Sequence, residues 1–274
     1  MALARIPSSF KICTTSTSNR QDSASRMHAI ATWFRHLNET TGINLTIAYD
    51  PFDQARFLHG LLITLELSGV TIVASVLVGI VGAWLQGSSL TSTRRLVQGY
   101  IQLFRNTPPL VQMFFFYFGL SSLLPTIRNS FGIQEPLVSG FGWACISLTF
   151  FAGAFNVEIF RSGIEAIPQS TIEAAEALGY TRLQTYIYVV LPLATRVCLP
   201  ALTNNLVNLV KTTTLAYAIA VPELLYVSNQ IWSDSVNVPV MMVVLFIAYI
   251  TLVGLLVFAM NSWERALRCP GLGT

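Results

Sequence analysis

Residues 170–192 read STIEAAEALGYTRLQTYIYVVLP, a short polar island between long apolar segments. Ser170 and Glu173 have the spacing of a capping box, and the helix formers after them end at Gly179, which suits a left-handed cap. A second capping signal begins at Thr181, so another helix is expected to run until Pro192 disturbs it. The stretch therefore predicts a helix, a tight turn and a second helix, with alanine side chains small enough for a partner to approach the backbone closely.

The composition around this island is that of a membrane protein. Of the 274 residues, 53% are hydrophobic and only 11% are charged, against a charged fraction of about 25% in soluble domains. About 20 consecutive apolar residues cross the hydrocarbon core of a bilayer. The charge-poor runs predict an all-α integral membrane protein with five transmembrane helices, at about residues 57–85, 106–127, 136–157, 197–216 and 235–262.

The basic residues between the expected spans indicate the side of the membrane on which each loop lies, because Lys and Arg in short loops stay cytoplasmic. The arginines that fall on one side are Arg94, Arg95, Arg161, Arg182, Arg265 and Arg268. The opposite loops, at residues 128–135 and 223–234, contain a single basic residue. This pattern predicts an N-terminus outside, a C-terminus in the cytoplasm, and a cytoplasmic position for the loop that contains Glu173.

Several motifs resemble the integral membrane subunits of ABC-type importers. The spacing of Glu173-Ala174-Ala175, Gly179 and Leu191-Pro192 is similar to the EAA loop of that family, with Val189 in place of the usual isoleucine. Motifs similar to its polar amino acid branch, of the histidine, glutamate and glutamine type, are Arg105–Gln112, Gly153–Arg161, Ile167–Pro168, Lys211–Leu215 and Val221–Glu223. The resemblance implies a MetI-like permease fold over about residues 57–264, with a coupling loop at about 165–192.

The resemblance also implies partners. In that family the EAA loop docks on an ATP-binding subunit, and the residues expected to couple to it here are Glu173, Ala174, Ala175, Gly179, Leu191 and Pro192. A second permease subunit, the same chain or a related one, and an extracytoplasmic amino acid binding protein complete the importer in the bacterial cytoplasmic (inner) membrane. The chain has no G-x-x-x-x-G-K-[ST] motif, so ATP hydrolysis is expected in another subunit. No enzyme activity, cofactor or metal is expected of this chain.

Three polar residues in the spans are candidates for the substrate pathway, and each has a structural alternative. Glu158 either contacts the ammonium group of an amino acid or pairs with Arg161, three residues further on. Lys211 either lies between two permeases, within reach of a substrate carboxylate, or anchors the helix end by snorkelling. Asn205 either lines the pathway or forms hydrogen bonds between helices.

An ion-gradient-driven secondary amino acid transporter is the alternative function. Such a protein would need inverted repeats or carboxylates inside the membrane as ion sites. Five spans do not divide into equal halves, and the acids are expected at the span ends, with Glu66 at the entrance of the first. These observations favour the ATP-driven importer.

The two ends of the chain are expected to lie outside the permease domain. Residues 1–56 are basic and Ser-rich without the apolar core of a signal peptide, which favours a disordered extension, or an upstream start codon with Met27 as the true start, over a transit sequence. Residues 265–274 are expected to form a cytoplasmic tail. The four cysteines are far apart and indicate neither a disulfide framework nor a zinc site, and the net charge of +3 gives no reason to expect nucleic acid binding.

Overall fold

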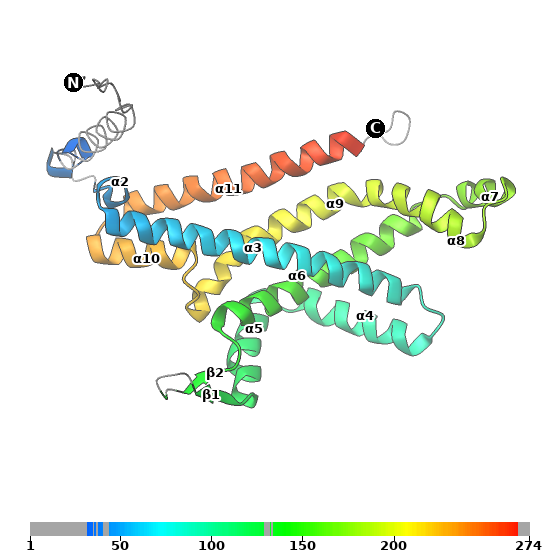
Figure 1. The fold of residues 1–274 in the computed structure, drawn as a ribbon, viewed down its shortest axis with the longest axis horizontal. Coiled ribbons are helices and arrows are strands. Elements are labelled where there is room, and N and C mark those ends of the chain that lie inside the picture. Colours follow the sequence, from blue (N-terminus) through cyan, green and yellow to red (C-terminus); the bar gives the residue numbers. More distant parts are fainter. Residues whose placement is uncertain are drawn as a thin grey trace, which may run out of the picture.

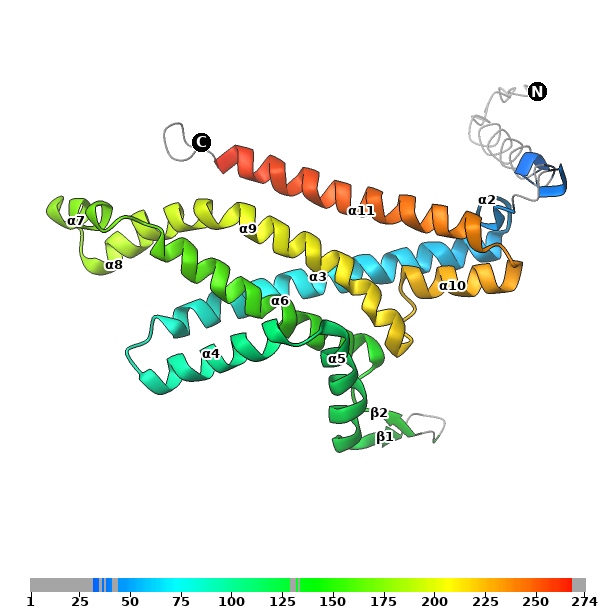
Figure 2. The same ribbon diagram turned by 180° about the vertical axis from the view of Figure 1, so that it is seen from behind.

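A computed structural model describes residues 32–34, 36, 38–40, 44–128, 132 and 134–267. Long helices run along one axis of the molecule (Figures 1 and 2). The helices are α2 (Thr46–Tyr49), α3 (Pro51–Gln86), α4 (Thr91–Asn106), α5 (Pro109–Phe114), α6 (Gly140–Glu165), α7 (Gln169–Ala177), α8 (Arg182–Thr185), α9 (Leu191–Thr212), α10 (Leu224–Ser235) and α11 (Val238–Leu267). The π-helices are η1 (Phe115–Leu120) and η3 (Tyr186–Val190), and the 3-10 helices are η2 (Ser121–Leu123) and η4 (Thr213–Ile219). Strands β1 (Thr126–Arg128) and β2 (Gln134–Pro136) pair antiparallel, the one departure from an all-α fold among the described residues.

Four helices in the described part of the chain are long and apolar enough to cross a membrane. They are Pro51–Gln86, Gly140–Glu165, the continuous helix Arg182–Ile219, and Val238–Ala266. The fifth expected span, at residues 106–127, is not among them. The first span begins at Pro51, earlier than expected, so Glu66 lies well inside α3 and not at its entrance.

The expected second span is a broken helix. The shorter apolar helix Pro109–Leu123 falls below the length of about 20 residues that crosses a bilayer alone. Pro108 and Pro109 cause the break, because the residue before a proline is pushed to an extended conformation, as at Thr107 with ψ 142°. The preceding residues, expected as a loop, form the amphipathic helix α4. Since α3 and α6 run in the same direction (Figure 1), α4 and α5 together make the return between them.

Helix α6 lies at the centre of the bundle, between α3 and α9. Leu67 of α3, Leu148 of α6 and Leu209 of α9 belong to one buried cluster. Helices α3 and α6 approach each other very closely at Gly82, where an added Cβ would lie 2.3 Å from a methyl carbon of Val157. Small residues at such crossings let the helix backbones pack directly in a membrane, where lipid gives little hydrophobic drive for association.

The outward faces of the long helices are apolar. Exposed side chains include Leu62, Val73 and Leu77 on α3, and Phe246 and Phe258 on α11. Extended apolar surfaces of this kind mark contact with lipid or with another protein. Together with the span lengths, they confirm the prediction of an integral membrane fold.

Helix α10 and its cap, which the sequence did not predict, organise the end of the bundle where α3 begins. Glu223 is fully buried, and its carboxylate accepts hydrogen bonds from the backbone N–H groups of Leu225 and Tyr226 at 2.9 and 2.8 Å. The Tyr249 hydroxyl donates a third bond at 3.0 Å, while the Thr64 hydroxyl accepts the N–H of Leu224 at 2.9 Å. One N-cap therefore joins α3, α10 and α11.

Candidate functional site

The predicted coupling loop lies at one end of the bundle, and α10 lies toward the other (Figure 1). Helix α6 ends at Glu165, and α7 follows after a short connection, so the predicted first helix is confirmed. The capping box at Ser170 is wrong, because α7 begins at Gln169 with Pro168 as its N-cap and without a side-chain cap. The extended backbone of Pro168, with φ −58° and ψ 138°, starts the helix before Ser170 is reached.

The turn between the two helices has the predicted left-handed glycine. Gly179 has φ +87°, a conformation that L side chains rarely adopt. Its N–H donates to the Glu176 carbonyl at 2.9 Å, and the N–H of Tyr180 donates to the Ala175 carbonyl at 3.2 Å, as in a Schellman cap. The capping box at Thr181 is also confirmed, with the Thr181 side chain and the Gln184 side chain each bonded to the other residue's backbone N–H.

The second helix does not end at Pro192, which corrects the sequence-based expectation. It continues from α8 through the π-helix η3 into α9 without interruption. Proline removes a backbone N–H and its ring crowds the carbonyl four residues earlier. The wider turn of η3, which ends two residues before Pro192, lets the helix pass this point. Leu191 and Pro192 are therefore the first residues of α9, beyond the turn that holds Gly179.

The inner side of the coupling loop is anchored to the bundle by apolar packing. Ile167, Val190 and Ala194 form a buried cluster, with Ile172 of α7 packed against it. Ala175 is only 5% exposed, whereas Glu173 and Ala174 face outward. The loop thus has a fixed inner face and a free outer face.

The free face contains large apolar side chains that the sequence interpretation missed. Leu178 is 80% exposed and Leu183 is 69% exposed, on either side of Gly179, and Tyr180 lies between them. We call the set of exposed residues Glu173, Ala174, Leu178, Tyr180 and Leu183 the coupling surface. The sequence contains a sign of these exposed residues. Large apolar residues on both sides of a glycine turn in a short polar segment cannot all be buried, so some of them are expected on the surface.

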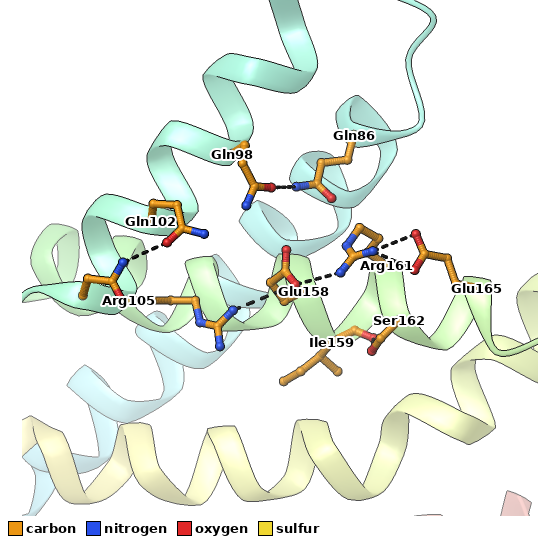
Figure 3. A network of polar contacts seen from close by, with 10 residues as sticks. Gln86, Gln98, Gln102, Arg105, Glu158, Ile159, Arg161, Ser162 and Glu165 are labelled. Atoms are coloured by element: carbon orange, nitrogen blue, oxygen red, sulfur yellow. Dashed lines mark hydrogen bonds and ion pairs between the residues drawn. The ribbon is translucent and has the colours of Figure 1, made fainter. Parts of the chain in front are cut away.

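A chain of charged side chains lies where α4 and α6 meet (Figure 3). The Arg161 guanidinium is 2.9 Å from Glu158 Oε2 and 2.6 Å from Glu165 Oε2. Arg105, at the end of α4, lies 3.9 Å from the same Oε2 of Glu158 and over the ring of Phe155 at 5.2 Å. The ion-pair alternative for Glu158 is therefore realised, and a substrate contact of the same carboxylate stays a prediction.

Two cavities adjoin this chain of charges. One of about 660 Å³ is lined by the end of α3, by Arg161 and Glu165, and by Tyr186 of η3. The other, of about 520 Å³, is lined by Gln86, Thr91, Arg94, Arg95, Gln98, Glu158 and Arg161. Among the residues that line these cavities, Gln86 and Arg161 belong to both.

The other two pathway candidates lie on α9 with opposite exposure. Asn205 is buried and donates to the Ala152 carbonyl at 3.1 Å and to Asn156 Oδ1 at 2.8 Å, so the interhelical alternative describes its contacts. Lys211 is exposed in the last turn of α9. A substrate contact at Asn205 or Lys211 stays a prediction.

The bundle of membrane-length helices defines a multi-pass membrane protein, with the coupling surface exposed at one end of it. A family model described as binding-protein-dependent transport system inner membrane component matches residues 69–268, and the chain belongs to this family. It is therefore an inner-membrane permease and not itself an enzyme. Membership implies separate ATPase subunits and a periplasmic binding protein as partners.

Relatives with known roles are permease subunits of amino acid importers. The histidine/lysine/arginine/ornithine transport system permease protein HisQ of Salmonella typhimurium (strain LT2) is 37% identical over 162 residues, which are 58% of this chain and 69% of that protein. The glutamate/aspartate import permease protein GltJ of Escherichia coli (strain K12) is 30% identical over 231 residues, which are 81% of this chain and 92% of that protein. The ion-gradient-driven alternative finds no support in these relatives.

Solved structures confirm the MetI-like permease fold. A crystal structure of an amino acid ABC transporter with histidines aligns with a TM-score of 0.68 and 27% identity, and covers 78% of this chain and 94% of that one. The inward-facing MetNI methionine ABC transporter aligns with a TM-score of 0.63 and 21% identity, and covers 80% of this chain and 99% of that one. At 21% identity, the similarity to the MetNI transporter shows a common fold and nothing further.

Proposed function

We propose that this permease imports polar amino acids, that it pairs with a second permease chain, and that the coupling surface is where an ATPase subunit docks. The observation that carries the proposal is the outer face of α7 and α8, where small and large apolar side chains stand exposed around a rigid glycine turn. A groove on the partner could receive Leu178 and Leu183 while the alanines let it reach the backbone. ATP binding would then move the loop, and hydrolysis would reset it.

A second permease is supported by the exposed polar face of α9. Asn204, Asn208 and Lys211 follow one another at helical spacing, and all three are exposed. Leu209 packs with Leu67 of α3, so this face lies at the depth of the spans. Polar and charged groups at that depth are costly against lipid and face a partner helix or a water-filled path. We infer that this face of α9 meets the second permease, which is either a copy of this chain or a related one.

The substrate class follows from relatives that differ in substrate charge. HisQ belongs to a histidine, lysine, arginine and ornithine system, and GltJ to a glutamate and aspartate system. Polar amino acids are what these substrates have in common. We infer that Glu158, which lines the cavity of about 520 Å³, attracts the ammonium group that every amino acid carries.

The proposal is tested by reconstitution. The permease is co-purified with candidate ATPase subunits, placed in proteoliposomes with a binding protein, and assayed with a panel of labelled amino acids that compete for uptake. ATP-dependent uptake of polar amino acids is the expected result. Uptake by the permease without any ATPase subunit, driven by an ion gradient, would contradict the proposal and favour a secondary transporter.

A further inference from the structure

Arg161 joins two carboxylates of its own helix α6, Glu158 three residues before it and Glu165 four residues after it. One nitrogen of its guanidinium lies 2.9 Å from Glu158 Oε2, and the other lies 2.7 and 2.6 Å from the two oxygens of Glu165. Glu158 lines the cavity of about 520 Å³, whereas Glu165 is the last residue of α6, four residues before α7 begins. A single side chain therefore connects the candidate pathway acid to the entry of the coupling loop (Figure 3).

Glu158 has a second, looser cation. Arg105 is 3.9 Å away, beyond the distance of a direct hydrogen bond, and Phe155 lies under its guanidinium. Arg105 also sits at the end of α4, just before the break at Pro108. If Arg161 moves away, Arg105 is the ion-pair partner that the Glu158 carboxylate keeps among the described residues, and the carboxylate gains room for an ammonium group.

The position of Arg161 makes it sensitive to the loop. It lines the cavity of about 660 Å³ together with Glu165 and with Tyr186, which stands on the return arm of the coupling loop. It also lines the cavity that contains Glu158. The side chains of Arg161, Glu158 and Glu165 are 37%, 22% and 61% exposed, and ion pairs this exposed stabilise a fold only slightly, so their partners can exchange at little cost.

We propose that Arg161 is a positioning residue that links the state of the coupling loop to the charge available at Glu158. In the present arrangement it neutralises Glu158. When ATPase subunits draw the loop and the last turn of α6 away from the bundle, Glu165, at the end of that turn, retains the Arg161 side chain, and Glu158 is released toward the substrate. The inference rests on the proposed function, because it takes the coupling surface and the pathway role of Glu158 as given.

The variant Glu165→Gln tests the link without touching the coupling surface or Glu158. In proteoliposomes with ATPase subunits and binding protein, we expect it to raise the ATP hydrolysed per amino acid imported by about threefold, since one partially exposed ion pair is lost. Co-purification with the ATPase is expected to stay unchanged. The matched control is Asp234→Asn, which removes another exposed carboxylate, 2.8 Å from Arg56, near the start of α3. The control is expected to leave the ATP-to-substrate ratio at the wild-type value.

A double variant separates a link from two unrelated ion pairs. If Glu165 acts through Arg161, then Arg161→Ala combined with Glu165→Gln raises the ratio no further than Arg161→Ala alone. Additive effects of the two substitutions would overturn the inference. It would also be overturned if Glu165→Gln left the ATP hydrolysed per amino acid unchanged while the wild-type complex coupled hydrolysis to uptake. Either result would leave the proposed function intact. Failure of the wild-type complex to couple ATP hydrolysis to uptake would instead reject the proposed function.

Discussion

The Asn205 side chain on α9 donates a hydrogen bond of 2.8 Å to Asn156 on α6, and Asn156 in turn donates to the Ser75 hydroxyl on α3 at 3.3 Å. Three membrane helices are thus connected by buried polar groups. The Asn156 side chain is fully buried, so it cannot exchange these hydrogen bonds for bonds to water. An unpaired buried polar group costs about 1 to 3 kcal/mol.

Replacing the donor is expected to destabilise the bundle. Asn205→Leu keeps the approximate volume but leaves Asn156 Oδ1 without its donor, so we expect a loss of about 1 to 2 kcal/mol in the free energy of unfolding. The loss of stability is measured as a lower midpoint in thermal unfolding of the purified protein. Asn261→Leu, at an exposed position of α11, is the matched control and is expected to shift the midpoint little. Equal midpoints for both variants would contradict the structural role of Asn205.

Gly179→Val is expected to misplace the coupling turn. A β-branched residue at φ +87° is strained by about 1 to 3 kcal/mol, and the turn would relax away from its present shape. The variant should insert into the membrane but fail to retain ATPase subunits and transport poorly. Gly254→Val on α11, where an added Cβ meets nothing within 4 Å, is the control. Normal ATPase association in Gly179→Val would reject the coupling role of this glycine.

Leu183→Ser is expected to weaken ATPase docking while leaving the fold intact. Leu183 contributes nothing to a core in the free protein, since 69% of it is exposed, so its apolar area is available to a partner. Burial of one anchor of this size at an interface contributes more than about 1 kcal/mol, which corresponds to a change in affinity of about fivefold or more. Titration of purified ATPase subunits measures this change. Leu96→Ser, an exposed leucine on α4, should not alter the affinity.

Glu158→Gln distinguishes a pathway role from a purely structural ion pair. Loss of one charge-assisted contact of about 1.5 to 3 kcal/mol to a substrate ammonium should reduce uptake about tenfold or more. Competition assays should also reveal a changed preference among cationic, neutral and acidic amino acids. If Glu158 serves only Arg161, the variant will lose thermal stability, neutralising Arg161 will ease the defect, and the substrate preference will not move.

Gly82→Val should prevent α3 and α6 from packing. An added Cβ already lies 2.3 Å from Val157, and forcing extra atoms into such a contact costs about 1 to 3 kcal/mol. The measured quantity is the midpoint of thermal unfolding. Gly69→Val is the control on the same helix, because a Cβ there meets nothing within 4 Å. A similar midpoint for both variants would contradict the close approach.

Local sequence was enough to predict the parts of the site that depend on neighbouring residues. The left-handed Gly179 and the capping box of Thr181 follow from backbone rules that act within four residues. The pairing of Glu158 with Arg161 was anticipated as one alternative for the same reason. Glu165 was missed although it stands four residues after Arg161, a spacing that the same helical rule identifies.

The remaining features depend on contacts that the sequence does not display. Ser170 has a capping pattern, yet the proline two residues earlier decides where the helix begins. Hydropathy does not reveal helix α4, because an amphipathic helix lying on α3 and α6 has low mean hydropathy. The bond from Asn205 to Asn156 joins residues far apart in the chain, and only the packing of α6 on α9 brings them together.

The π-helix ahead of Pro192 has a consequence for the angular relation between the coupling loop and the membrane span. Each residue of an α-helix turns the chain by about 100°, and a π-helical turn takes in one residue more than an α-helical turn. The faces of α8 and α9 are therefore offset from those of a single regular helix. Deleting one residue within Tyr186–Val190 should restore the regular winding and leave Leu183 close to its present direction, because the π-helical turn takes up one extra residue. A substitution that forces this segment into a regular α-helix at its present length would instead turn Leu183 by about 100° around the axis of α9, and so re-aim the coupling surface without changing any residue on it.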